Sequence, residues 1–274
     1  MTADLHIHST ASDGLFSPAQ LFEMGREAGL QYMALTDHDS LEGLPAWPQE
    51  TGGPRLIPGV EISCMLDQDI HILAYGVHTG MSGLTDFLTR MRRDRIQRFS
   101  LMVEKLRELG LSVALDRFDL SSCTSIGRAH LARALFESGQ VTCIQDAFNR
   151  FLGPGCPTYV PRPRLSPREA IALLREEGAV PVIAHPGLYG FSPAHLLSLL
   201  KEWQKAGLMG VEVYHSANRP PQPYETAARE LDLIITGGSD FHGLHDGHSP
   251  LGSQCTLWRT LHQDLERLLT ALKM

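Results

Sequence analysis

The stretch that decides the fold is Asp4–Asp13, D-L-H-I-H-S-T-A-S-D, close to the start of the chain. Residues 3–8 have the composition of a short buried strand, and a polar loop follows. Because successive side chains of a strand point to opposite faces, His6 and His8 project from the same face and can chelate one cation. Asp13 can add a carboxylate oxygen from the loop. A pair of core histidines at a strand end is the alternative, but two His and two Asp within ten residues favour a metal site.

The length and composition predict one large domain, or one domain with an insertion. The chain has 274 residues, of which 43% are hydrophobic, and such a chain can build a sizeable core without disulfides or oligomerisation. Its formal net charge of -7 argues against a protein that coats nucleic acid through an extended basic surface. A nucleotide or a short strand held at a metal centre stays compatible with this charge, because divalent cations reverse the local sign.

Cysteine usage and the N-terminal segment predict a cytoplasmic protein. The five cysteines include no C-x-x-C pair, and an odd number cannot all pair within one chain, so we expect reduced thiols. The first strand begins almost at the N-terminus and leaves no room for a signal peptide, and no apolar run approaches the length of a membrane span. We therefore expect no contact with a membrane.

Short apolar segments alternate with helical patterns along much of the chain. The expected strands are residues 3–8, 32–36, 56–63, 69–77, 180–184, 210–214 and 233–236. Helices are expected to start at Ser17-Pro18, Ser166-Pro167 and Ser192-Pro193, and to cover about 222–231 and 259–273. Between 79 and 165 the pattern changes to helical stretches at 82–109, 126–138 and 143–152, followed by a Gly- and Pro-rich loop at 153–164. We interpret residues 79–165 as a helical insertion in a domain formed by residues 1–78 and 166–274.

The polar candidates of the domain decide between two α/β architectures. They lie at or just beyond the C-terminal ends of several expected strands. Parallel strands joined by helices form either a barrel or an open doubly wound sheet. In a barrel these strand ends converge on one mouth, whereas an open sheet spreads them along a crevice. The sequence therefore favours an α/β barrel, whose mouth the insertion would cap.

The candidates number nine, which is too many for one tetrahedral cation with about four ligands. They are His6, His8, Asp13, His38, Glu61, His71, His185, Asp240 and His242. The number suits two or three divalent ions, with Glu61 or Asp240 as a bridge. No cysteine belongs to the set, which favours manganese, iron or zinc. His71 or His185 taken alone could equally be a structural residue, but the whole set is not explained in that way.

The chain resembles the PHP (polymerase and histidinol phosphatase) family in four motifs. These are H-I-H with Asp13, T-D-H-D at 36–39, A-H-P at 184–186 and G-S-D-F-H at 238–242, and P-G-V-E-I-S at 58–63 also fits. The resemblance implies a distorted, TIM-like (β/α)7 barrel that holds a trinuclear metal site, commonly of manganese, iron or zinc. It assigns the nine residues above as ligands. Asp37 is a weaker candidate for a ligand, and we favour a role in which it supports a ligand histidine.

The insertion resembles one subgroup of that family, the 3′,5′-nucleotide bisphosphate phosphatases and related 5′→3′ exoribonucleases. The matching segments are S-I-G-R-A-H-L-A-R-A-L at 125–135 and F-N-R-F-L-G-P-G-C-P-T-Y-V-P at 148–161. The resemblance implies that Arg128 and His130 hold a substrate phosphate; an exposed helical Arg and an incidental His are the alternative. Residues 214–223 depart from the subgroup, which leaves the nucleoside side of the substrate open.

The predicted function is a metal-dependent phosphoesterase. Its substrate would be a phosphomonoester, either the 3′-phosphate of a nucleoside 3′,5′-bisphosphate or the 5′ end of a short RNA, attacked by a metal-bound hydroxide with manganese favoured. We assign catalytic roles to Asp13, His215 and His242, with one of the two histidines protonating the leaving oxygen. The alternatives are another PHP phosphatase such as a histidinol-phosphatase-like enzyme, an amidohydrolase-type C–N hydrolase, and a non-enzymatic PHP module. The module is disfavoured because no expected ligand is missing.

Two further groups of charged residues are expected to lie on the surface. His245 and His248 follow the last ligand motif, and we favour a surface position over a role in a lid. The basic run between Arg90 and Arg98 is interspersed with Asp and is typical of a solvated helix face. The sequence alone does not give the oligomeric state.

Overall fold

The computed structural model describes residues 2–48, 52–113, 125–161, 163–243, 249–253 and 262–274. It divides into two compact units. The first comprises Met1–Asp86 with Arg164–Met274, and the second comprises Phe87–Pro163. The role of residues 79–165 as a cap over the mouth of the barrel stays a prediction.

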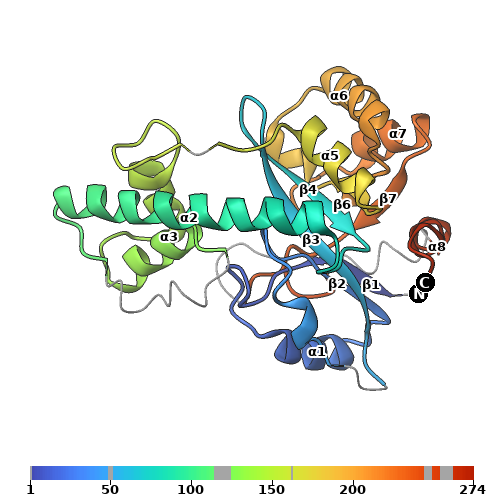
Figure 1. The fold of residues 1–274 in the computed structure, drawn as a ribbon, viewed down its shortest axis with the longest axis horizontal. Helices are drawn as coiled ribbons and strands as arrows, with labels where there is room; N and C mark the ends of the chain where they lie inside the picture. Colours follow the sequence, from blue (N-terminus) through green and yellow to red (C-terminus); the bar gives the residue numbers. More distant parts are fainter. Residues whose placement is uncertain (1, 49–51, 114–124, 162, 244–248, 254–261) are drawn as a thin grey trace. The chain divides into compact units, whose positions relative to one another are not determined.

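The first unit is built on a seven-stranded sheet whose strands follow one another in chain order (Figure 1). They are β1 (Ala3–Ile7), β2 (Tyr32–Leu35), β3 (Arg55–Met65), β4 (Asp69–Tyr75), β5 (Val180–Ile183), β6 (Gly210–Tyr214) and β7 (Ile234–Gly237). The sheet nearly closes, because Ile7 bridges Phe241 and the His8 amide donates to the Phe241 carbonyl at 3.0 Å. All seven expected strands are present, and the predicted distorted barrel is confirmed.

The fourth strand corrects the expectation of parallel strands joined by helices. β4 pairs antiparallel with both β3 and β5, and only residues 66–68 separate it from β3. Its beginning therefore lies at the same end of the barrel as the C-terminal half of β3. Ser63 stands opposite His71 in this pairing. For this reason His71 reaches the mouth from the start of a strand rather than from its end.

Besides the start of α2 (Ser82–Glu108), the described part of the first unit contains five helices and two short 3-10 turns. The helices are α1 (Pro18–Glu27), α5 (Pro167–Glu176), α6 (Pro193–Ala206), α7 (Gln222–Glu230) and α8 (His262–Ala271), and the turns are Leu44–Ala46 and Pro186–Tyr189. The predicted starts of α1, α5 and α6 are confirmed, since Ser17, Ser166 and Ser192 each cap the helix that follows. The expected final helix is described only from 262, because 254–261 lie outside the described residues.

The second unit is helical, as the sequence predicts. It contains most of α2 (Ser82–Glu108), then α3 (Arg128–Glu137) and α4 (Ile144–Ala147), which continues into a π-helical turn at Phe148–Leu152. Its core includes Phe99, Leu106, Leu131 and Leu135, which are all buried. Among the described residues of the chain, no helix is both long enough and apolar enough to cross a bilayer.

Candidate metal centre

Strand β1 places two imidazoles at the centre of the candidate site. Ile7 packs with Phe22 and Phe241 in a core under α1, so His6 and His8 project from the other face of the strand. Both rings are completely buried, and their Nε2 atoms lie 3.1 Å apart. The rings therefore converge, as the spacing in the sequence predicts.

Glu61 on β3 lies in the middle of five histidines. Its Oε2 is 2.9 Å from His38 Nδ1, 3.3 Å from His8 Nε2 and 3.4 Å from His6 Nε2. Its Oε1 is 2.9 Å from both His71 Nδ1 and His185 Nε2. The sheet explains this arrangement, because His38 forms a bridge beside Glu61 and the β3–β4 pairing brings His71 to the same face. The two oxygens of this buried carboxylate thus face two different groups of imidazoles.

Asp240 brings the last strand to the same place. Its Oδ1 lies 3.1 Å from His8 Nε2 and 3.2 Å from His6 Nε2, and its Oδ2 lies 3.5 Å from His215 Nε2. The closure of β1 on β7 makes these contacts possible, since the Asp240 amide donates to the His6 carbonyl at 2.9 Å. Asp240 therefore faces two groups of side chains with its two oxygens, as Glu61 does.

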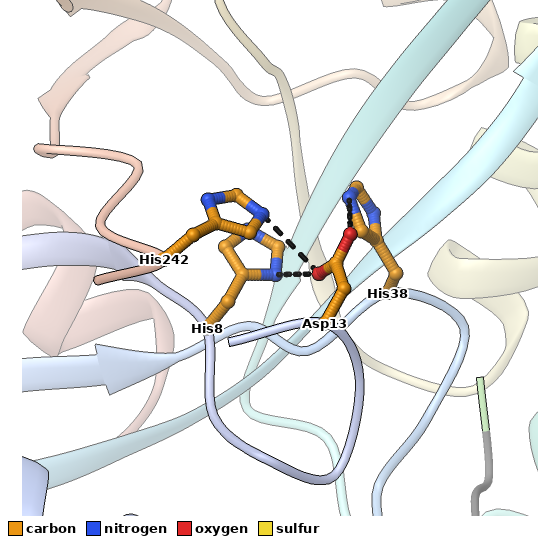
Figure 2. A group of neighbouring side chains, drawn as sticks. All are labelled: His8, Asp13, His38 and His242. Atoms are coloured by element: carbon orange, nitrogen blue, oxygen red, sulfur yellow. Dashed lines mark ion pairs between the residues drawn. The ribbon is translucent and has the colours of Figure 1, made fainter. Parts of the chain in front are cut away.

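Asp13 forms a second group with three histidines at the mouth (Figure 2). Its Oδ1 is 3.2 Å from His242 Nε2 and 3.9 Å from His8 Nδ1, and its Oδ2 is 3.9 Å from His38 Nε2. Figure 2 shows the carboxylate between the rings of His8 and His242 on one side and that of His38 on the other. The loop after β1 therefore delivers Asp13 to the place that the sequence predicts.

The backbone is strained at three residues that follow strands. Asp39, His185 and Asp240 have φ angles of 48°, 27° and 54°, in a region that non-glycine residues rarely occupy. Such strain persists only when the surroundings fix the conformation, and it concentrates at functional sites. Here the fixing contacts include the Asp39 carboxylate, which accepts from the Ser63 amide at 2.8 Å.

The carboxylates of the site stay ionised although they are buried. Burial alone would raise the pKa of Glu61, but His38, His71 and His6 lower it well below its usual range. Burial is likewise outweighed at Asp240, whose pKa is lowered well below its usual range mainly by His6 and His242. The centre therefore holds permanent negative charge in its interior.

Four of the imidazoles divide into two classes according to the direction in which their pKa is shifted. Burial would lower the pKa of His6, but Glu212, Glu61 and Asp240 raise it well above its usual range. Burial also opposes the charge on His8, yet the neighbouring carboxylates of Asp240 and Glu61 raise its pKa to about 10. For His38 and His185 burial prevails and the pKa is lowered.

The donor set fits divalent cations. The ligand atoms form three groups, and within each group all atoms lie within 4.8 Å of one another. Three residues, His8, His38 and Glu61, each belong to two of these groups. Although Glu61 Oε2 lies 2.9 Å from His38 Nδ1, neither atom makes a well-directed hydrogen bond to any described residue. Nitrogen and oxygen atoms that converge without well-directed hydrogen bonds are the arrangement that a cation satisfies. The clusters of imidazole and carboxylate donors indicate that the chain binds divalent metal ions.

Residues outside the predicted ligand set fix its members. Glu212 was not among the predicted site residues, yet its Oε1 lies 3.0 Å from His6 Nδ1 and its Oε2 accepts from the His185 amide at 2.7 Å. A lone charge in the apolar strand G-V-E-V-Y is the signal that could have found it. Tyr189 was also missed: its hydroxyl accepts from the His71 amide at 2.9 Å and lies 3.2 Å from His185 Nδ1.

Asp37 contacts the loop that follows β1. This carboxylate accepts from the amide and hydroxyl of Ser9, at 2.8 and 2.7 Å, and from the hydroxyl of Ser12 at 2.5 Å. It therefore holds the loop that carries Asp13, and through the Ser12 hydroxyl, which lies 3.5 Å from His8 Nδ1, it also adjoins a ligand histidine. His245 and His248 lie outside the described residues.

Two predicted phosphate-binding residues lie in the second unit. Arg128 begins α3, with its guanidinium 5.7 Å from the ring centre of Phe148 and 5.9 Å from that of Tyr159. His130 lies in the first turn of α3, where its Nδ1 accepts from the Gly127 amide at 3.2 Å. Their role toward phosphate stays a prediction.

Comparison with known proteins identifies the family of this chain. A PHP domain matches residues 4–99. The 5′-3′ exoribonuclease Rnm of Salmonella typhimurium is 32% identical over 247 residues, which cover 87% of this chain and 84% of that protein. The chain belongs to the PHP family.

Two more proteins resemble this PHP chain over most of its length. The 3′,5′-nucleoside bisphosphate phosphatase of Chromobacterium violaceum is 31% identical over 258 residues, or 91% of this chain and 90% of that protein. The crystal structure of a proposed metal-dependent phosphoesterase from Bifidobacterium adolescentis superposes with a TM-score of 0.86 at 30% identity, covering 98% of this chain and 96% of that one. This PHP protein is a metal-dependent phosphoesterase, and the predicted family, fold and enzyme class are confirmed.

Proposed function

We propose that the nine predicted ligands hold two or three divalent cations, with manganese favoured, and that this centre hydrolyses a phosphate ester of a nucleotide. The observation that carries the proposal is the position of Glu61. One fully buried carboxylate faces three imidazoles with one oxygen and two with the other, which suits a bridge between cations. The absence of sulfur among the donors supports manganese, iron or zinc over softer ions.

Cations in this centre would lower the pKa of a bound water and neutralise the negative charge on the phosphate oxygens. The chain's own residues orient these partners. Asp13 and His242 approach from the mouth, whereas Glu61 lies at the base with 0% exposure. A phosphate entering from solvent would therefore meet the group of Asp13 first.

The hydrogen bonds separate the roles of the two candidate proton donors. His242 Nδ1 lies 2.9 Å from the Asp240 carbonyl, which can only accept, so this nitrogen carries the proton and the lone pair of Nε2 points toward Asp13 Oδ1, where a cation would lie. His215 has the opposite arrangement: its Nδ1 accepts from the Ala217 amide at 3.1 Å, which leaves the proton on Nε2, beside Asp240. We therefore assign His242 as a ligand and His215 as the hydrogen-bond donor to the leaving oxygen.

For the substrate we propose the 3′-phosphate of a nucleoside 3′,5′-bisphosphate, or the 5′ end of a short RNA. The names of the similar proteins support this class. Arg128 lies near Arg95 and Arg98 in the second unit, and guanidinium groups are the side chains that best bind phosphate through paired hydrogen bonds. We assign Arg128 and His130 to a substrate phosphate. Three described cysteines, Cys64, Cys143 and Cys156, are free thiols, which supports a cytoplasmic location.

The test is a phosphate-release screen with added Mn²⁺. The substrates are a nucleoside 3′,5′-bisphosphate, nucleoside monophosphates, histidinol phosphate and a short 5′-phosphorylated RNA, with nucleotide products followed for the RNA. We expect the bisphosphate or the RNA to be the best substrate. Turnover of histidinol phosphate alone would overturn the substrate assignment, and release of ammonia from amide substrates without any phosphate release would overturn the reaction class.

A further inference from the structure

Glu212 lies behind the metal centre, on the central residue of β6, and is fully buried. Each of its two oxygens contacts a predicted ligand that comes from another element. Oε1 lies 3.0 Å from Nδ1 of His6 on β1, and Oε2 lies 2.7 Å from the amide nitrogen of His185, after β5. The carboxylate thus connects two ligands without facing the centre itself.

The contact with His6 is made by the nitrogen that points away from the centre. The other nitrogen, Nε2, faces Glu61 Oε2 at 3.4 Å and Asp240 Oδ1 at 3.2 Å. A neutral imidazole carries one proton, and only the nitrogen without it can bind a cation. A carboxylate can only accept, so a proton on Nδ1 is stabilised by Glu212 and the lone pair stays on Nε2.

We propose that Glu212 is a positioning residue that selects the tautomer of His6, keeping the proton on Nδ1 so that Nε2 faces the cations. This inference rests on the proposed metal centre and goes beyond it, because it concerns a residue outside the ligand set. Partners of this kind orient a ligand imidazole, and their loss lowers metal affinity or activity by about 10–100-fold.

The contact with His185 makes the inference testable by a change of one atom. The backbone amide of His185 can only donate a hydrogen bond, so the side-chain atom that it faces must accept. In Glu212→Gln the side-chain oxygen is therefore held at His185, and the NH₂ group is turned toward His6 Nδ1. That group donates, so Nδ1 must accept and the proton moves to Nε2. The variant keeps the shape of the side chain but presents the wrong tautomer to the cation.

The experiment uses the full chain loaded with zinc, which is diamagnetic. Long-range ¹H–¹⁵N spectra of histidine-labelled protein identify the protonated nitrogen of each ring, and competition with a chelator gives the zinc affinity. In the wild type we expect a proton on His6 Nδ1 and zinc on Nε2. In Glu212→Gln we expect the affinity of the weakest zinc site to fall by about 10–100-fold. The matched control is Glu225→Gln on α7, where the carboxylate accepts from the Tyr214 hydroxyl at 3.3 Å and the zinc affinity should not change.

The outcomes separate this inference from the proposed function. A wild-type chain that holds no zinc would refute the proposed metal centre. A wild type that holds zinc with His6 bound through Nδ1, or a Glu212→Gln variant with unchanged affinity and tautomer, would overturn the role of Glu212 alone. Because the wild-type spectrum reports the tautomer directly, it decides the question even if the variant does not fold.

Discussion

Loading the demetallated protein with metal should release about two protons per chain at pH 7.5, because a ligand imidazole must give up its proton to bind a cation. The protons come from His6 and His8. The pKa of His8 is raised to about 10 and that of His6 lies well above its usual range, so both rings are charged at this pH. Their Nε2 atoms face Glu61 and Asp240, where cations would replace the two protons.

Five of the other ligands should contribute little to this release. Asp13, Glu61 and Asp240 have lowered pKa values and carry no proton at pH 7.5, although burial opposes their ionisation. Burial keeps His38 and His185 neutral. With two protons displaced, the apparent metal affinity should rise about 100-fold per pH unit while both rings are charged, and less steeply as the pH approaches the pKa of His8.

Calorimetry measures this release directly. Manganese is titrated into demetallated protein at one pH in several buffers of different ionisation enthalpy, and the slope of the observed enthalpy against that quantity counts the protons. We expect a slope near two, and His8→Gln should lower it by one. A slope below about one half at pH 7.5 would refute the reasoning, because the buried carboxylates would then not hold protons on these rings.

Three substitutions test other parts of the structure. Glu61→Gln replaces one of the two facing oxygens with a donor, and loss of one cation, worth about 4 kcal/mol of transition-state stabilisation, should lower kcat about 1,000-fold. Phosphate release and metal content check this, and full metal content with near-normal kcat would contradict it. Arg128→Ala should raise KM more than it lowers kcat if its phosphate is not the one cleaved, and steady-state kinetics would show the reverse if it is. Gly187→Ala places a Cβ 2.3 Å from the Ala217 carbonyl oxygen and should destabilise the chain by about 2 kcal/mol, measured by urea unfolding; an unchanged midpoint would show that this loop yields.

The barrel was predictable because each of its strands is a short apolar run that ends in polar residues. A buried strand needs apolar side chains, and a metal centre at the barrel mouth needs polar ligands. Residues 3–8 contain both kinds of side chain, so this one stretch predicts a strand and a site together. The alternation of His6 and His8 with Leu5 and Ile7 fixes which face of β1 points toward the site. Both patterns lie within a few consecutive residues, so they can be recognised from the sequence alone.

What the sequence did not reveal depends on pairing between distant segments. The strand β4 looks like any other apolar run, and only its short connection to β3 indicates that it runs antiparallel. Glu212 touches His6 across 206 positions of sequence, and no periodicity encodes such a contact. Asp37 was expected to support a ligand histidine, and the sequence did not reveal its direct contacts, which are Ser9 and Ser12 in the loop after β1.

The charge of the centre suggests how many cations it holds. Asp13, Glu61 and Asp240 lie in the centre and Glu212 lies directly behind it, and all four carboxylates have lowered pKa values although burial opposes their ionisation. Two divalent cations would just neutralise them and leave no charge for a substrate. Three would leave a surplus of two positive charges, which matches a phosphate monoester, whose second pKa is about 6.

We therefore expect inorganic phosphate to strengthen binding of the last cation, because burying uncompensated charge is unfavourable. Metal content after gel filtration, with and without phosphate in the buffer, measures this effect. The ratio should reach three per chain with phosphate and fall below three without it. Two metal ions per chain under both conditions would contradict this reasoning, because the centre would then have no surplus positive charge for the substrate.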